Sequence, residues 1–211
     1  MRSAPLSSGL VVAGVICIAG LTACGGDDGP DCDCAAAGCF ADMCTKTVFV
    51  LDKAIPADIG GVAAADSLCA QQAAAAMLPG VYSAWLSDAS SSPYQRFSKS
   101  TVPYVLADGT MLADDWDALT REGPAAVIDV NASGQKVAAE DGAIVWTGTG
   151  VDGRADDYNG ASNFCSGWSR NVLEDSTLVG YLTRRTKSSD WSRVVPTVSC
   201  TGAGFLYCVQ Q

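Results

Sequence analysis

The sequence predicts a domain of the α+β class, built of short and mostly antiparallel strands with one main helix. Short apolar runs rich in β-branched and aromatic residues recur between turns of Gly, Asp and Asn, as they do in sheet proteins. One Ala-rich stretch, residues 62–78, is long enough for a regular helix. Only 17% of the 211 residues are charged and 22 are Gly, so we expect a globular protein with many turns.

The first half of the predicted domain contains two strands and the helix. Residues 46–51, KTVFVL, and residues 82–87, YSAWLS, are apolar runs of strand length. The helix at 62–78 lies between them, and Pro79 and Gly80 end it because neither residue continues a helix well. We therefore expect the order strand, helix, strand.

The second half is predicted to contain a hairpin, three further strands and one long loop. The turn at Ala107–Gly109 joins two short apolar runs and is typical of a hairpin. Strands are predicted at residues 143–148, 178–183 and 204–209. Residues 149–163, called the long loop below, contain no hydrophobic run. A loop of this length usually carries function or needs a covalent restraint.

Charge and composition exclude several classes of function. The formal net charge is −10, so nucleic acid and sulphated polysaccharide are unfavourable partners. The chain contains no His. Ser-His-Asp and Cys-His catalysis, His-ligated zinc and imidazole acid–base chemistry are therefore excluded, because each needs that side chain.

The N-terminus has the features of a lipoprotein leader. Arg2 precedes an apolar run at residues 10–21, which is too short to span a bilayer comfortably and is typical of a signal peptide. The run ends in LTAC, which resembles the lipobox of bacterial lipoproteins. We expect residues 1–23 to be removed and Cys24 to be acylated, which would anchor the chain in the cell envelope, at the outer membrane or cell surface, without a transmembrane helix.

Residues 24–45 are predicted to form a Cys-rich tether. Ten cysteines, less Cys17 in the leader and the acylated Cys24, leave eight, and an even number suits disulfide pairing outside the cytosol. The tether contains four of them, and ring strain disfavours a bond between the first two. Two pairings stay open, first with third and second with fourth, or first with fourth and second with third. A zinc knuckle is the alternative. The four residues are Cys32, Cys34, Cys39 and Cys44.

Residues 46–211 resemble endostatin, a domain with a C-type lectin-like fold, and resemble still more the endostatin-like domain of spirochaete lipoproteins. The resemblance rests on the order and spacing of several motifs rather than on any single one. They are the helix with Cys69, Tyr82–Ser87, Asp115–Asp117, Val145–Gly148, Asn163–Trp168, Val198–Cys200 and Leu206–Cys208.

The resemblance implies a fold and two disulfides, and it allows the binding sites of the family to be compared with the residues of this chain. It implies that Cys69 pairs with Cys208 and that Cys165 pairs with Cys200. Endostatin binds zinc largely through histidines and heparin through arginines, and this acidic chain has no histidine. The Glu-Pro-Asn, Gln-Pro-Asp and Trp-Asn-Asp triplets of sugar-binding C-type lectins do not occur in the domain either. Calcium-dependent sugar binding of that kind is therefore not implied.

Oxygen-bearing side chains in the long loop are candidate calcium ligands. Asp152, Asp156 and Asp157 are the predicted metal residues, with Asn159 and Asn163 near them. The loop lacks the spacing of an EF-hand, and Asp and Asn are also common turn formers. Ordinary turns are the alternative, and no other cofactor is expected.

Aromatic and basic residues near the C-terminus complete the predicted binding surface. Trp191 lies in a polar run and is predicted to be exposed, next to the basic residues Arg184, Arg185 and Lys187. Together with the Asp-rich long loop, they are expected to line a ligand surface, because loops on a rigid scaffold often carry recognition. The remaining tryptophans are predicted to lie in the core. They are Trp85, Trp116, Trp146 and Trp168.

The sequence thus favours a surface-tethered lipoprotein that acts as a non-catalytic binding module for an extracellular protein or glycan. By resemblance, the spirochaete proteins bind host matrix and complement proteins, but a shared fold does not transfer a ligand. A structural protein of the cell envelope is one alternative. An enzyme acting on polysaccharide is another, with Asp114, Asp115 and Asp117 around Trp116 as the carboxylates. A solvated turn is the simpler interpretation of those three residues.

Overall fold

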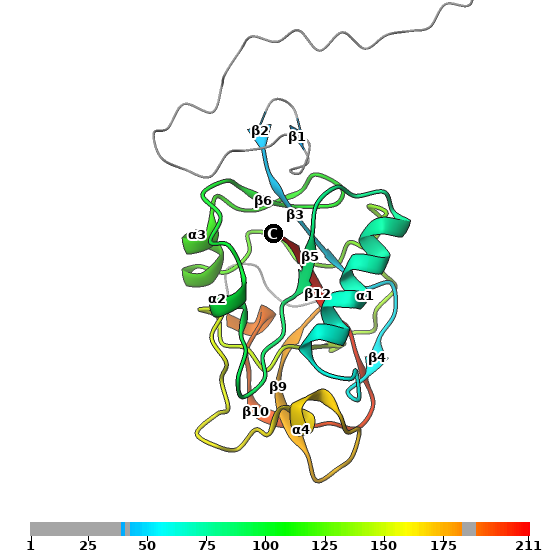
Figure 1. The fold of residues 1–211 in the computed structure, drawn as a ribbon, viewed down its shortest axis with the longest axis vertical. Helices are drawn as coiled ribbons and strands as arrows, with labels where there is room; N and C mark the ends of the chain where they lie inside the picture. The colour runs from blue at the N-terminus through cyan, green and yellow to red at the C-terminus, as the bar shows by residue number, and fades with distance from the viewer. Residues whose placement is uncertain (1–38, 41–42, 183–188) are drawn as a thin grey trace, which may run out of the picture. The chain divides into compact units, whose positions relative to one another are not determined.

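A mixed five-stranded sheet lies at the centre of the described chain, which comprises residues 39–40, 43–182 and 189–211 (Figure 1). In this computed structural model, β3 and β6 are parallel and the other neighbouring strands are antiparallel. Val48 of the first strand lies opposite Val209 of the last, so the two ends of the domain are adjacent. The strand order is β5 (Tyr82–Ala84), β12 (Tyr207–Gln210), β3 (Lys46–Val50), β6 (Tyr104–Leu106) and β7 (Met111–Ala113).

Both faces of this sheet are covered. On β3, Phe49 packs into a cluster with the buried side of α1 (Val62–Ala75), whereas Val48 and Val50 belong to a second cluster. The second cluster includes side chains from α3 (Trp116–Arg121) and Phe97, which follows α2 (Pro93–Arg96). Figure 1 shows α1 on one side of the central strands and α2 and α3 on the other. Strand β3 is therefore buried on both faces.

Helix α1 begins where the sequence predicts and ends earlier. The prediction extended the helix to residue 78, but the last helical residue is Ala75. Met77 has φ +58, in the left-handed region, and its N–H donates to the carbonyl of Ala74. The Leu78 N–H donates to the carbonyl of Ala73, which is typical of a helix C-terminus. The chain thus leaves the helix before Pro79 rather than at it.

A three-stranded sheet is formed by the part of the chain between β7 and β12 of the central sheet. Its order is β10 (Val194–Ser199), β9 (Ser176–Tyr181) and β8 (Ile144–Trp146), all antiparallel. Backbone bonds between Trp146 and Phe205 (2.9 Å) and between Phe205 and Ile144 (2.9 Å) attach this sheet to the segment that leads into β12. Two smaller pairs complete the strands, β4 (Ile55–Pro56) with β11 (Ala203–Gly204) and β1 (Cys39–Phe40) with β2 (Met43–Cys44).

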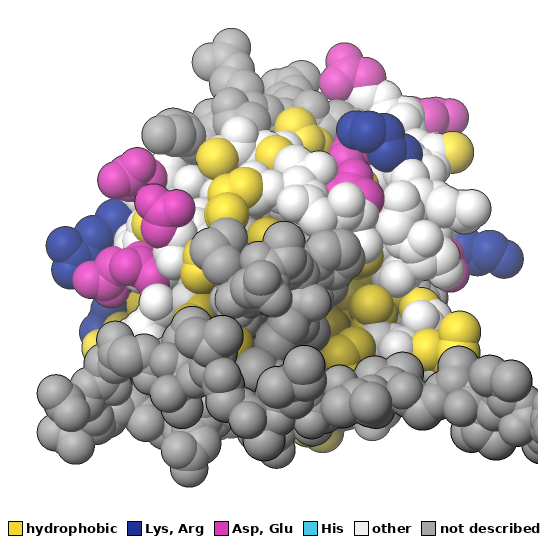
Figure 2. Space-filling view, turned by 90° about the horizontal axis from the view of Figure 1, so that it is seen from above, with side chains coloured by type: hydrophobic (Ala, Val, Ile, Leu, Met, Phe, Trp, Pro, Cys, Tyr) yellow, Lys and Arg dark blue, Asp and Glu magenta, His cyan; other side chains and the backbone are white. Residues whose placement is uncertain are grey.

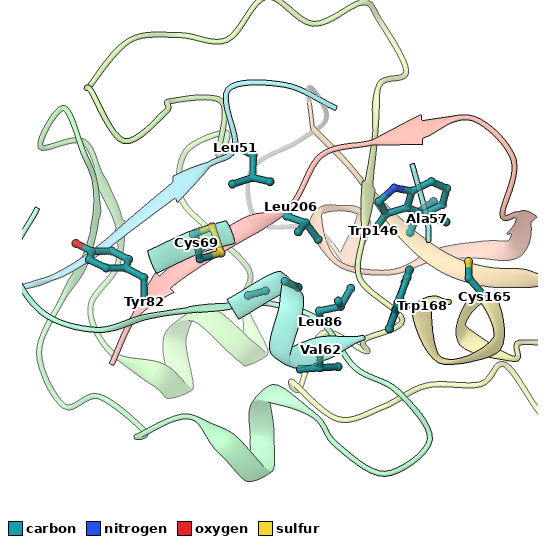
Figure 3. Packing of buried hydrophobic residues seen from close by; sticks show 14 of the residues in the cluster. Leu51, Ala57, Val62, Cys69, Tyr82, Leu86, Trp146, Cys165, Trp168 and Leu206 are labelled. Atoms are coloured by element: carbon teal, nitrogen blue, oxygen red, sulfur yellow. A yellow bond between two sulfur atoms is a disulfide. The ribbon is translucent and has the colours of Figure 1, made fainter. Parts of the chain in front are cut away.

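Two disulfides close the domain, and they are the two that the resemblance implied. Cys69 of α1 is bonded to Cys208 of β12, with their Cα atoms 5.4 Å apart. Cys165 is bonded to Cys200, with their Cα atoms 5.6 Å apart. All four are fully buried. Figure 3 shows the first bond in the α1-side cluster, close to Tyr82, with Cys165 near Trp168.

The structure confirms the α+β class and corrects several boundaries. The predicted hairpin is present, since β6 and β7 are antiparallel and Gly109 in the turn between them has φ +88. The predicted strands at 82–87 and 143–148 are each three residues long, and the strand at 178–183 is shifted to β9. The short helices α2 and α3 and the strand β10 were not predicted. None of the helices that the structure describes combines the length and hydrophobicity needed to cross a membrane.

Several predictions fall outside the described residues. They concern the leader, the acylated Cys24, the tether residues Cys32 and Cys34, and the basic residues Arg184, Arg185 and Lys187. In the tether, the backbone pairing of β1 with β2 places Cys39 opposite Cys44. The pairing of the tether cysteines stays a prediction.

Figure 2 shows the end of the domain that lies uppermost in Figure 1. Acidic and basic side chains are interspersed along the edge of this face, and hydrophobic and neutral side chains lie between them. Charges of both signs therefore occur on this face although the chain as a whole is strongly acidic.

Candidate functional site

An aromatic cluster lies beneath the long loop. It consists of Trp85, Phe97, Trp116, Trp191 and Tyr207, each 7% exposed or less. The ring centroids of Trp85 and Trp191 are 4.7 Å apart, and those of Trp85 and Trp116 are 5.6 Å apart. Such contacts between aromatic rings stabilise a core beyond the area they bury. Trp85 is central to the cluster because it also contacts Phe97.

The prediction that Trp191 is exposed is wrong. The residue is 2% exposed, and its ring also lies 6.0 Å from that of Tyr207. It reaches this position because the chain passes very close to β9. A Cβ on Gly180 would lie 1.8 Å from the Trp191 carbonyl oxygen, so only Gly fits at that point. Trp191 is therefore part of the aromatic cluster beneath the loop and cannot line the surface of the loop.

Buried hydroxyl groups join the aromatic cluster to the start of the long loop. The indole N–H of Trp85 donates to the Ser192 hydroxyl (2.7 Å), which donates to the carbonyl oxygen of Thr149 (2.9 Å). The hydroxyls of Thr149 and Ser87 are 2.8 Å apart and hydrogen-bonded. The Thr147 hydroxyl donates to the Ser192 carbonyl (2.7 Å). Because these groups are buried and satisfied, breaking any one of these bonds is costly.

The first part of the loop is a tight turn that rests on the cluster. The Gly150 N–H donates to the Arg154 carbonyl (2.8 Å), and the Gly153 N–H donates to the Gly150 carbonyl (3.0 Å). Gly153 has φ +80, and a Cβ there would lie 3.0 Å from the Trp116 ring. Its carbonyl accepts from the Tyr94 N–H of α2 (2.7 Å). A larger residue at 153 would lift the turn from the ring beneath it.

An ion pair holds the middle of the loop. The Asp156 carboxylate pairs with the guanidinium of Arg193 and accepts from the Tyr158 N–H (2.8 Å). The Asp156 N–H donates to the Gly148 carbonyl (3.1 Å). Arg193 directly follows Ser192, so two consecutive residues hold two different points of the loop.

A left-handed turn directly follows the long loop. Phe164–Trp168, labelled α4, has positive φ at every residue, from +51 to +68. Non-Gly residues in this region cost roughly 1–2 kcal/mol each, so other contacts must maintain the conformation. The disulfide at Cys165 is one such contact, and the Trp168 carbonyl also accepts from the N–H groups of Gly60 (2.8 Å) and Gly61 (3.3 Å).

Asp175 is the polar centre of that turn. Its carboxylate accepts from the Ser166 hydroxyl (2.8 Å) and the Asn163 amide (2.6 Å), and the Arg170 guanidinium lies 3.6 Å away. The residue is 4% exposed. The Ser166 hydrogen bond is the main cause that lowers the pKa of Asp175 below its ordinary value, assisted by Asn163 and Arg170. Asp175 is therefore a structural carboxylate.

A hollow of about 330 Å³, called the loop hollow below, lies where the long loop meets α2. The guanidinium of Arg154 stacks on the ring of Tyr94, 3.6 Å from its centroid, and pairs with Asp152 at 3.0 Å. The lining is polar apart from two alanines. The lining residues are Asp88, Ala89, Ser90, Ser91, Ser92, Tyr94, Gln95, Arg154 and Ala155.

A second hollow, of about 340 Å³, is lined by different residues. It is formed by residues 138–144 together with Ala54, Ala203 and Phe205. Its lining is mainly small and apolar, with Glu140 and Asp141 as its charged members. It offers fewer groups that could orient a polar ligand than the loop hollow does.

The predicted loop ligands have different partners in the structure. Asp152 pairs with Arg154 and Asp156 with Arg193, whereas Asp157 and Asn159 are exposed. Within the residues described, no three His, Cys, Asp or Glu side chains form a group that could hold a metal ion. Calcium binding stays a prediction.

The carboxylates around Trp116 have structural contacts. Asp115 is the N-cap of α3 and accepts from the Ala118 N–H (2.7 Å). Asp117 forms an exposed ion pair with Arg121, one turn further along α3, and Asp114 is exposed. Trp116 is buried, as are Trp85, Trp146 and Trp168, which confirms the predicted core tryptophans.

Several residues of the site were missed by the sequence analysis. Tyr94 and Arg154 form the loop hollow, and Ser192 and Arg193 hold the loop. Ser92 followed by Pro93 is a recognisable helix-start signal and could have located α2. Ser192 and Arg193 carried no signal, because a buried serine in a polar run looks like an exposed one.

No protein-family model matches the chain, and no curated protein matches it significantly.

Proposed function

We propose that the chain is a surface-tethered lipoprotein whose domain is a non-catalytic binding module for an extracellular protein or glycan. In this proposal Cys24 carries the acyl anchor, residues 24–45 form the tether, and the domain adopts a C-type lectin-like, endostatin-like fold in the bacterial envelope. The resemblance of its motifs supports the fold assignment, and so do the two disulfides that it implied.

One observation carries the proposal of binding. The long loop has no regular secondary structure, yet its turn, its middle and its end are each held by buried or ion-paired side chains. Its outward groups, such as Arg154 and Asp157, remain exposed. A polar surface that is held in place before a ligand arrives loses less entropy on binding than a mobile one. This arrangement suits recognition better than it suits a connecting loop.

The direct test is a glycan and matrix-protein array probed with the full-length chain, with and without EDTA. The proposal expects binding to a defined group of spots, and loss of that binding when the Gly153→Val substitution lifts the loop from the aromatic cluster. Gly109→Ala, in the exposed β6–β7 turn, is the matched control. Loss of binding with EDTA would assign calcium to the loop. A chain that is folded and binds no spot contradicts the proposal.

A structural role in the envelope is the second candidate, and exposed hydrophobic residues favour it. Met77 is 89% exposed and Val81 is 66% exposed, just beyond the C-terminal end of α1. Exposed apolar side chains near one another often mark a protein contact. The structural role would be favoured if the chain pulled down envelope components only when Met77 and Val81 were both intact. The array would at the same time have to show no binding.

A further inference from the structure

We infer that the loop hollow is a calcium-independent subsite for a neutral saccharide. The inference rests on the proposed binding function and names the ligand class and the place of contact. The subsite lies between α2 and the turn of the long loop. Its volume of about 330 Å³ is near the lower end of the range for ligand pockets, roughly 300–1,000 Å³.

The polar groups of the hollow both donate and accept. Asp88 accepts through one oxygen from the Ser90 N–H (2.8 Å) and hydroxyl (2.9 Å), and its other oxygen has no partner among the described residues. The Ser91 hydroxyl and the Gln95 amide nitrogen likewise have no partner in the described part of the chain. Sugar hydroxyls donate and accept alike, so a saccharide can satisfy such a mixed set.

The charges of the hollow favour a neutral ligand over an anion. Asp88 and Arg154 are the charged residues that line the hollow. The guanidinium of Arg154 already donates to Asp152 (3.0 Å), and outside the lining the Lys99 ammonium donates to the Tyr94 carbonyl (2.8 Å). An acidic sugar would therefore meet a guanidinium that is already paired with a carboxylate, and it would lie against the Asp88 carboxylate.

The geometry of Arg154 explains how the subsite is held ready. Its guanidinium is stacked on Tyr94, and Asp152 takes one of its five N–H donors. The stack fixes the plane of the group, so its other N–H groups point in set directions. The Lys99 ammonium lies 4.3 Å from the same ring and adds a second cation–π contact. Lysine at position 154 would keep the charge and lose this fixed plane.

The test is ligand-observed saturation-transfer NMR on the full-length chain in a sugar-free detergent. The probes are neutral hexamers of glucose, galactose, mannose and N-acetylglucosamine, and a hexuronate hexamer, all with EDTA present. We expect at least one neutral hexamer to bind with a dissociation constant on the order of 1 mM, and to bind more tightly than the hexuronate.

Substitutions assign that binding to the hollow. Arg154→Ala and Asp88→Asn are expected to weaken it at least about tenfold, because each removes a hydrogen bond that involves a charged group. The Arg154→Lys variant should bind more tightly than Arg154→Ala and more weakly than the wild type. Arg121→Ala and Asp117→Asn, which break an exposed ion pair on α3, are the matched controls and should leave it unchanged. Thermal unfolding of each variant checks that it is folded.

Two groups of results would overturn the inference. If no neutral hexamer binds, or if the hexuronate binds best, the ligand class is wrong. If a neutral hexamer binds equally to all variants, the location is wrong. Binding on the array that survives both hollow substitutions would leave the binding function standing and remove only this subsite. An array without any binding removes both.

Discussion

The two faces of the central sheet are held together by different means. On the α1 side, a long helix packs through small side chains and one disulfide joins it to the last strand. On the other side, large aromatic rings pack together, and buried hydroxyls connect them to the long loop. The first face closes the fold, whereas the second positions a surface. We expect substitutions on the first face to act mainly on global stability and those on the second to act also on the loop.

The largest loss of unfolding free energy should come from removing the two disulfides. Replacing Cys69 and Cys208 with Ala opens a ring of 139 residues, which costs about 5 kcal/mol of unfolding free energy in the chain-entropy model. Replacing Cys165 and Cys200 opens a ring of 35 residues and costs about 4 kcal/mol in that model. Guanidinium unfolding of the two double variants measures both values. A larger loss from the second pair would contradict the chain-entropy ordering of the two bonds.

Trp191→Ala should be the most damaging single substitution on the loop side. It removes a fully packed ring and leaves a cavity under the long loop, which typically costs about 3–5 kcal/mol. Urea unfolding measures the loss, and Val81→Ala, at an exposed site, should change the free energy by less than about 0.5 kcal/mol. A Trp191→Ala chain of native stability would contradict the burial of this residue.

Ser192→Ala should have a smaller effect, concentrated in the loop. The substitution leaves the Trp85 indole N–H and the Thr149 carbonyl without their partner, at a cost of about 1–3 kcal/mol. Ser67→Ala, on the exposed side of α1, is the control and should be nearly neutral. Denaturant unfolding and loop proteolysis would be measured together. A loop that is equally resistant to protease in both variants would contradict the role given to Ser192.

The smallest predicted effect is on the loss of stability at acidic pH. The pKa of Asp175 is lower in the folded state than in the unfolded state, so the carboxylate contributes stability that is present above its ordinary value of about 3.9. That stability is lost as the pH falls from there through the folded pKa. Asp175→Asn should therefore flatten the decline of unfolding free energy at acidic pH, whereas Asp117→Asn should not. Identical acid profiles for wild type and Asp175→Asn would contradict this assignment.

The α1 side of the molecule was largely predictable from local pattern. The strand at Lys46–Val50, the helix from Val62 and the β6–β7 turn each have a signal within a few residues, because propensity and turn chemistry act locally. The α+β class followed from the same signals. The helix end was wrong by one turn, since the chain leaves the helix through a left-handed Met77 that no pattern indicates.

The loop side was much less predictable, because its structure depends on contacts between distant segments. Trp191 lies in a polar run, yet it is buried because Trp85 and Gly180 create a place for it. The left-handed turn at Phe164–Trp168 depends on Asp175 and a disulfide, not on its own composition. The long loop itself was identified by its length, but the hollow beside it required Tyr94, which is separated from Arg154 by sixty residues in the sequence.

Amide hydrogen exchange tests most directly whether the long loop is held as a rigid surface. The N–H groups of Gly150 and Gly153, and that of Tyr94, which donates to the loop, are the probes. We predict that all three exchange at least about 100-fold more slowly than in an unstructured peptide, and that Ser192→Ala removes this protection. Exchange of the loop amides at the unstructured rate, while the backbone N–H of Trp85, which donates to the Tyr207 carbonyl of β12, stays protected, would contradict the account.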